Sequence, residues 1–278
     1  MKHITALVSG KGGVGKTLLT AAFGVAEARK GKRVLLLDLD MGMGNLDLAL
    51  GLSPKYSMLG LVMGKCREKD AILHIQGGPD FLAAHFKRDW REIKKADVGR
   101  VLEDFADDYD LILLDCPAGR GKGTEFAKVA ADSFLLIAGP SKASAINAKR
   151  TAEWLGNADI HAVYNDFCSN GAFSFSEAAS VLKQIPIGGL IPHSDFVNRL
   201  LQEGRMAEYE EDSVFGKAVD ASLRVIDGET EFSKDAALTF LRDETTGNIR
   251  PSSSVSMHPA SRLHRARLSS RYGRRGIY

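Results

Sequence analysis

The strongest constraint on the fold is a regular alternation of short apolar runs with longer segments of helical periodicity. Runs rich in Val, Ile and Leu with no polar alternation are typical of strands that are buried on both faces of a sheet. These runs occupy residues 4–8, 34–37, 111–114, 134–138, 161–164 and 187–191, and helical segments such as 16–29, 98–106 and 143–155 lie between them.

Strands that alternate with helices predict an α/β fold in which a doubly wound, mostly parallel sheet is covered on both faces. Ligands of such sheets bind beyond the carboxyl ends of the strands. Functional residues are therefore expected just after Val8, Leu37, Leu114, Ala138 and Tyr164.

Composition excludes several classes of protein. With 278 residues, of which 44% are hydrophobic, the chain can bury a sizeable core. Its apolar runs are too short to cross a bilayer, and the first one leads straight into a glycine-rich loop, unlike a signal peptide. Cys66, Cys116 and Cys168 lie far apart in the sequence. A reduced, cytoplasmic setting is expected, without a disulfide framework or a zinc ribbon.

The charge of the chain is unevenly distributed. Residues 250–278 contain seven arginines and no lysine or acidic residue, so the first 249 residues carry a net charge of −5 although the whole chain carries +2. We expect residues 1–249 to form the folded domain and residues 250–278 to be a flexible Arg/Ser-rich tail. Such a tail either binds a polyanion, an anionic membrane surface or DNA, or stays solvated without a partner.

A phosphate-binding loop connects the first apolar run to the first helical segment. The pattern G-x-x-x-x-G-K-[ST] is satisfied in full by Gly10, Lys11, Gly12, Gly13, Val14, Gly15, Lys16 and Thr17. Glycines let successive backbone N–H groups surround phosphates, and the N-terminus of the following helix favours negative charge. Lys16 is expected to contact the β- and γ-phosphates, and the hydroxyl of Thr17 is expected to bind Mg²⁺.

Three carboxylates follow apolar strands that are expected to lie beside this loop. Asp38 and Asp40 come at the end of the second run, and Asp115 ends the third. Because side chains alternate along a strand, we expect that Asp38 and Asp40 do not both serve one helix cap. Acids in this place orient water or hydrated Mg²⁺. We therefore expect Asp38 and Asp115, with Thr17, to hold Mg²⁺, partly through water.

The loop Gly-Lys-Gly-Gly-Val-Gly-Lys-Thr resembles the deviant Walker A loop of the MinD/ParA family of P-loop NTPases, within the SIMIBI class. Residues 38–52 are similar to switch I of MinD and FlhG, and residues 115–119 are similar to switch II. The resemblance implies that Lys11 reaches the nucleotide of a partner subunit and that Asp40 positions the attacking water. It also implies that Asn165 and Pro192 contact the adenine base.

This resemblance covers roughly residues 2–224 and implies a biological role. It implies a cytoplasmic, Mg²⁺-dependent ATPase that forms an ATP-dependent homodimer and is accelerated by an activating partner protein. Such a protein would act as a spatial regulator of a division site, of flagella or of plasmids, peripherally at the inner membrane or at the nucleoid. Two features depart from MinD: residues 140–142 read Pro-Ser-Lys, and His193 replaces the usual acid after Pro192.

Two alternatives remain open from the sequence. The first is a reductase-type or metal-insertion ATPase related to nitrogenase iron protein, which would need paired cysteines to hold a cluster or metal. The second is a scaffold that binds nucleotide without hydrolysing it, against which Lys16 and Asp40 argue.

Overall fold

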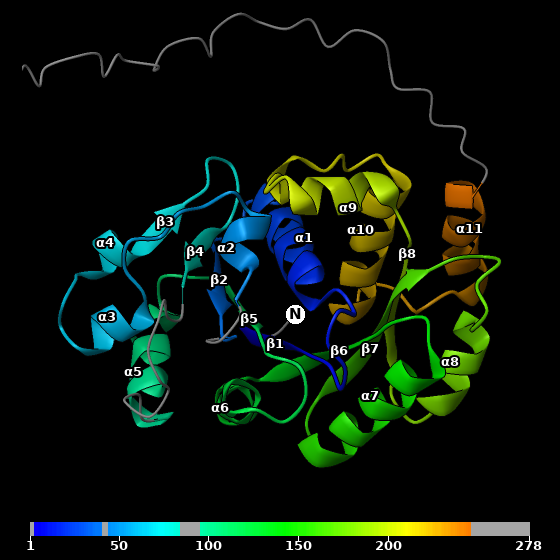
Figure 1. Cartoon of the computed structure of the whole chain (residues 1–278), viewed down its shortest axis with the longest axis horizontal. Coiled ribbons are helices and arrows are strands. Elements are labelled where there is room, and N and C mark those ends of the chain that lie inside the picture. Colours follow the sequence, from blue (N-terminus) through cyan, green and yellow to red (C-terminus); the bar gives the residue numbers. More distant parts are fainter. Residues whose placement is uncertain (1–2, 41–43, 84–94, 246–278) are drawn as a thin grey trace, which may run out of the picture. The chain divides into compact units, whose positions relative to one another are not determined.

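The computed structural model describes residues 3–40, 44–83 and 95–245. These residues contain an eight-stranded sheet in the order β3-β4-β2-β5-β1-β6-β7-β8 (Figure 1). Every neighbouring pair is parallel except β3 and β4, which are antiparallel. The strands are β1 (Ile4–Val8), β2 (Val34–Asp38), β3 (Ile72–His74), β4 (Asp80–Leu82), β5 (Leu111–Asp115), β6 (Ser133–Ala138), β7 (Ile160–Phe167) and β8 (Ile187–Pro192).

Helices connect the strands. They are α1 (Lys16–Arg29), α2 (Leu46–Ala49), α3 (Met58–Val62), α4 (Glu68–Ala71), α5 (Lys95–Ala106), α6 (Lys122–Ala130), α7 (Lys142–Leu155), α8 (Phe175–Val181), α9 (Asp195–Gln202), α10 (Val214–Ile226) and α11 (Lys234–Thr245), with a 3₁₀ turn at Met206–Glu208. Among the residues that the structure describes, no helix is long and apolar enough to cross a membrane. The predicted tail, residues 250–278, lies outside the described residues.

The two faces of the sheet are buried in separate cores. Alternate side chains of β5 illustrate this, because Ile112 and Leu114 belong to one core whereas Leu111 and Leu113 belong to the other. The first core is completed by α3, α4, α5, α6, α7, α8 and α11, and the second by α1, α2, α9 and α10 (Figure 1). The predicted doubly wound, mostly parallel sheet is confirmed, and its apolar runs are buried on both faces as that fold requires.

The helix that follows the phosphate loop packs unusually close to the sheet. A Cβ atom on Gly24 of α1 would lie 2.5 Å from Cδ2 of Leu36 in β2. Small residues therefore bring α1 against the strands, and most of its residues are buried. This packing holds the N-terminus of α1 in place at the carboxyl edge of the sheet, where the phosphates are expected.

Candidate functional site

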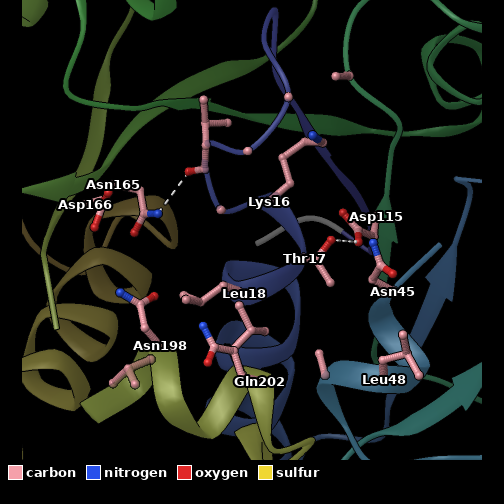
Figure 2. Close-up of a pocket in the computed structure, with 18 of the residues that line it drawn as sticks. Lys16, Thr17, Leu18, Asn45, Leu48, Asp115, Asn165, Asp166, Asn198 and Gln202 are labelled. Carbon is pink, nitrogen blue, oxygen red and sulfur yellow. Dashed lines mark hydrogen bonds between the residues drawn. The ribbon is translucent and has the colours of Figure 1, made fainter. Parts of the chain in front are cut away.

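A cavity of about 590 Å³ lies at the carboxyl ends of the central strands, as the fold class predicts. Its walls come from the phosphate loop, from the carboxyl-end residues of β5, β7 and β8, from the segments that follow β2, β5 and β8, and from α2, α9 and α10 (Figure 2). The lining includes most residues that the sequence assigned to nucleotide binding, namely Gly12, Gly13, Val14, Gly15, Lys16, Thr17, Asp40, Asp115, Asn165 and Pro192. Gly10, Lys11 and Asp38 do not line it.

Lys16 lies within the curve of the phosphate loop. Its ammonium group donates to Oγ of Ser9 over 3.0 Å, and the Ser9 hydroxyl donates to the carbonyl of Lys11 over 2.8 Å. The side chain is largely buried yet lines the cavity. A buried cation surrounded by loop backbone provides a preorganised binding site for phosphate oxygens.

Thr17 and Asp115 meet at the floor of the cavity. The Thr17 hydroxyl donates to Oδ2 of Asp115 over 2.6 Å (Figure 2). The other oxygen, Oδ1, is buried and has no hydrogen-bond partner. Burial raises the pKa of Asp115 to about 6, against the lowering effects of Thr17 and Lys16. A hydroxyl beside an unsatisfied buried carboxylate oxygen is a donor set that fits Mg²⁺.

Asp38 lies beside Asp115, since the two residues are paired in register between β2 and β5. Its carboxylate accepts backbone hydrogen bonds from Asp40 over 2.8 Å and from Leu46 over 3.2 Å. Burial, followed by the charge of Asp115, raises the pKa of Asp38 to about 8. Asp38 thus braces the segment that carries Asp40 to the cavity, and its predicted contact with Mg²⁺ stays a prediction.

Lys11 and Lys16 differ in their surroundings although they belong to one loop. Lys11 is exposed and lies outside the lining of the cavity, whereas Lys16 is buried inside it. One lysine of the loop therefore faces the ligand space of its own subunit, and the other is accessible to a second molecule. The contact of Lys11 with the nucleotide of a partner subunit remains a prediction.

Asn165 fixes the opposite wall of the cavity to the phosphate loop. Its Nδ2 donates to the carbonyl of Val14 over 2.9 Å (Figure 2). The amide lies so close to the loop that a Cβ on Gly15, whose φ is 92°, would be 2.2 Å from Nδ2. Pro192 ends the neighbouring strand β8 and lines the same wall.

Further lining residues were not assigned from the sequence. They are mainly Asp166 and Ser194 beside the strand ends, Asn198, Leu201 and Gln202 on α9, and Phe215 on α10. Asn198 and Gln202 lie near Leu18, on the same wall as Asn165 (Figure 2). The spacing of Asn198, Leu201 and Gln202 on one helical face was a signal that could have identified them.

The loop also packs tightly against α7, and this contact leads to a prediction about stability. A Cβ on Gly10 would lie 2.2 Å from the backbone oxygen of Asn147. We expect Gly10→Ala to lower the free energy of unfolding by about 1–3 kcal/mol, because neither backbone can yield without displacing the loop or α7. Chemical denaturation of the nucleotide-free protein measures the change.

Gly12→Ala is the matched control, since its Cβ would meet only the Cβ of Ala118 at 4.0 Å. Equal stability of the two variants would contradict the close packing of the loop against α7.

The three cysteines lie on separate segments of the fold. Cys116 is buried directly after Asp115, and Cys66 and Cys168 lie partly buried on other segments. Within residues 3–40, 44–83 and 95–245, no group of three or more His, Cys, Asp or Glu side chains could hold a metal ion.

Comparison with known proteins agrees with this geometry. Residues 5–207 match the family described as the CobQ/CobB/MinD/ParA nucleotide binding domain. An uncharacterized ATP-binding protein of Methanocaldococcus jannaschii is 33% identical over 199 residues, which is 70% of this chain and 75% of that protein.

Two solved structures share both fold and sequence with the chain. MinD in the MinC:MinD cell division protein complex of Aquifex aeolicus is 29% identical, with a TM-score of 0.74 over 84% of this chain and 98% of that one. The septum site-determining protein MinD of Pyrococcus horikoshii, complexed with Mg-ADP, is 26% identical, with a TM-score of 0.72 over 86% and 98%. The chain therefore belongs to the CobQ/CobB/MinD/ParA family of nucleotide-binding domains.

Proposed function

We propose that this protein is a Mg²⁺-dependent ATPase of the MinD/ParA type that dimerises when it binds ATP and acts as a spatial regulator in the cell. The observation that carries the proposal is the different surroundings of the two lysines of one loop. Lys16 is buried and lines the cavity, whereas Lys11 is exposed and lies outside the lining. An ordinary phosphate loop needs only the first of these.

The residues of the cavity suit ATP hydrolysis. Backbone N–H groups of the loop, the N-terminus of α1 and the Lys16 ammonium bind the phosphates. Thr17 and Asp115 would hold Mg²⁺, which neutralises charge on the β- and γ-phosphates when it is bound. Asp40 lines the cavity next to these groups and orients the attacking water.

The base lies at the other end of the cavity in this proposal. Asn165 offers both a donor and an acceptor to a purine edge, and Pro192 covers the base beside it. Lys11 then reaches the phosphates of a second subunit, so that two subunits enclose two nucleotides face to face.

The biological role is proposed from the relatives. Two solved structures that resemble the chain in both sequence and fold are described as a cell division protein complex and a septum site-determining protein. We infer that cycling between ATP-bound dimer and monomer positions a cellular structure, at the cytoplasmic surface of the membrane or on the nucleoid. An activating partner protein would set the hydrolysis rate.

Phosphate release tests this proposal. Purified full-length protein is incubated with ATP, with and without Mg²⁺, and in the presence of anionic vesicles or of DNA. Hydrolysis that requires Mg²⁺ supports the proposal. Binding of ATP with no turnover under any of these conditions would instead favour a scaffold, and protein purified with bound iron or zinc would favour the metal-insertion alternative.

The seven arginines of residues 250–278 lead to a prediction about targeting. Truncation after residue 249 should leave ATP hydrolysis unchanged and remove binding to anionic vesicles or DNA at low salt, since each basic residue near an anionic surface contributes about 1 kcal/mol. Co-sedimentation with vesicles measures binding to the membrane surface, and a mobility shift measures binding to DNA.

A full-length variant whose tail arginines are all replaced by Gln controls for the length of the tail, and it should behave like the truncated protein. If the truncated and full-length proteins bind equally, the targeting surface lies within residues 1–249.

A further inference from the structure

A histidine joins the ends of two strands at the wall of the nucleotide cavity. Nδ1 of His193, which directly follows β8, lies 2.6 Å from Oδ1 of Asp166 in β7. Nε2 of the same ring lies 3.1 Å from Oδ1 of Asp195, the first residue of α9. The His193 backbone N–H donates to the carbonyl of Phe167 over 2.9 Å and extends the pairing of the two strands.

This arrangement selects one protonation state of the ring. A neutral imidazole has one donor nitrogen and one acceptor nitrogen, whereas both nitrogens are donors in the imidazolium. Because both nitrogens of His193 face carboxylate oxygens, only the charged ring satisfies both contacts. The hydrogen bond to Asp166 is the main cause that raises the pKa of His193, burial opposes it, and Asp195 adds to the rise.

Asp166 adopts a backbone conformation that needs such support. Its φ is 69°, and among the described residues it is the only residue other than glycine with a positive φ. It lies at a shift in the register between β7 and β8, where Pro192 pairs with Phe167 instead of with Asp166. A strained conformation of this kind persists only where surrounding contacts hold it.

The strained residue is part of the cavity wall. Asp166 and Ser194 both line the cavity, and Asn165, next to Asp166, is fixed to the phosphate loop through Val14. Ser194 caps α9, whose face carries Asn198 into the same wall. One histidine therefore connects the turn that presents Asn165 to the start of α9, the helix that contributes Asn198 to the same wall.

We propose that His193 is a positioning residue whose charged ring holds the turn at Asp166 and the start of α9 in the arrangement that binds the nucleotide base, so that nucleotide affinity falls when the ring loses its proton. This inference rests on the proposed function, because it concerns the same cavity. The charged and titratable groups near the ring are Asp166 of β7, Asp195 of α9 and the Cys168 thiol after β7. Burial raises the pKa of Cys168, which keeps this thiol neutral.

The pH dependence follows from the direction of the shift. A histidine whose charged form is stabilised contributes fully below its ordinary pKa, and the contribution is lost as pH rises through its raised value. Affinity should therefore be greatest in mildly acidic solution and fall towards alkaline pH. By linkage, bound nucleotide should raise the pH at which His193 titrates.

The test measures the affinity of the full-length protein for a fluorescent adenosine diphosphate with Mg²⁺ between pH 6 and 9. His193→Gln should bind about threefold to tenfold more weakly than wild type at pH 6 and equally at pH 9. Asp166→Asn, which keeps a side chain that tolerates positive φ, should also lose the pH dependence. Taking the ratio to wild type removes the titration of the nucleotide itself.

His74→Gln is the matched control, because Nδ1 of His74 lies 2.6 Å from Oδ1 of Asp80 in the same kind of pair between β3 and β4, outside the cavity lining. Its affinity should equal that of wild type throughout. A His193→Gln ratio that is the same at pH 6 and pH 9 would overturn the inference while leaving nucleotide binding intact. Failure of wild type to bind the nucleotide at any pH would overturn the proposed function as well.

A second measurement needs no variant that could fail to fold. Proton NMR follows the ring resonance of His193 during a pH titration of wild type, with and without magnesium adenosine diphosphate. The midpoint of the His193 titration should rise by about 0.5 to 1 pH unit when nucleotide is bound. This range is the decimal logarithm of the expected threefold to tenfold change in nucleotide affinity. A midpoint that nucleotide does not move would reduce His193 to a purely structural contact.

Discussion

Lys16→Ala should abolish detectable ATP binding, with a loss of affinity on the order of 100-fold or more. Lys16 is the side-chain cation in the lining of the cavity, and its ammonium lies within the loop, 3.0 Å from Oγ of Ser9. Charge-assisted contacts to phosphate oxygens in a largely buried site contribute about 1.5–3 kcal/mol each, and the variant loses those to two phosphates. Isothermal titration of the variant with ATP and Mg²⁺ measures the loss.

Lys69→Ala provides the control for this experiment. Lys69 is an exposed cation on α4, outside the cavity lining, so this variant loses the same charge without touching the loop. Thermal unfolding of both nucleotide-free variants establishes that each is folded. Unchanged ATP affinity in a folded Lys16→Ala protein would disprove the assignment of the phosphate loop.

Lys11→Ala and Asp40→Ala should change the dimer in opposite directions. Lys11 is exposed and lies outside the lining of its own cavity, so its removal should spare ATP binding but weaken the ATP-dependent dimer and its activated hydrolysis. Asp40 lines the cavity, and its removal should slow hydrolysis about 100-fold or more while the ATP-bound dimer accumulates. Sedimentation velocity with ATP, together with phosphate release, separates the two effects.

The same Lys69→Ala variant should match wild type in both measurements, which excludes a general effect of charge on association. A Lys11→Ala protein that dimerises and hydrolyses ATP like wild type would leave an ordinary phosphate-loop ATPase, in which the exposed lysine has no partner. An Asp40→Ala protein with normal turnover would show that another group orients the attacking water.

Much of the sheet could be predicted because most of its strands can be identified from a short apolar run in the sequence. The runs that became β1, β2, β5, β6, β7 and β8 are mainly apolar and rich in Val, Ile and Leu, a composition that burial on both faces of the sheet favours. β3 and β4 were missed because they contain three residues each, too few for either an apolar run or an alternation to stand out. Their pairing depends on contact with β2, which lies far away in the sequence.

The sequence by itself determined the phosphate loop, the acids at the strand ends and the family, since each of these is encoded by adjacent residues whose chemistry requires fixed spacing. Only the tertiary structure decided how distant segments meet. In the folded chain, the Asp38 carboxylate accepts hydrogen bonds from the backbone of Asp40 and Leu46. Gly10 packs against Asn147, and His193 lies between Asp166 and Asp195. The physical reason is that parallel strands bring together residues widely separated in the chain, and no local pattern records which side chains will then share a proton or a charge.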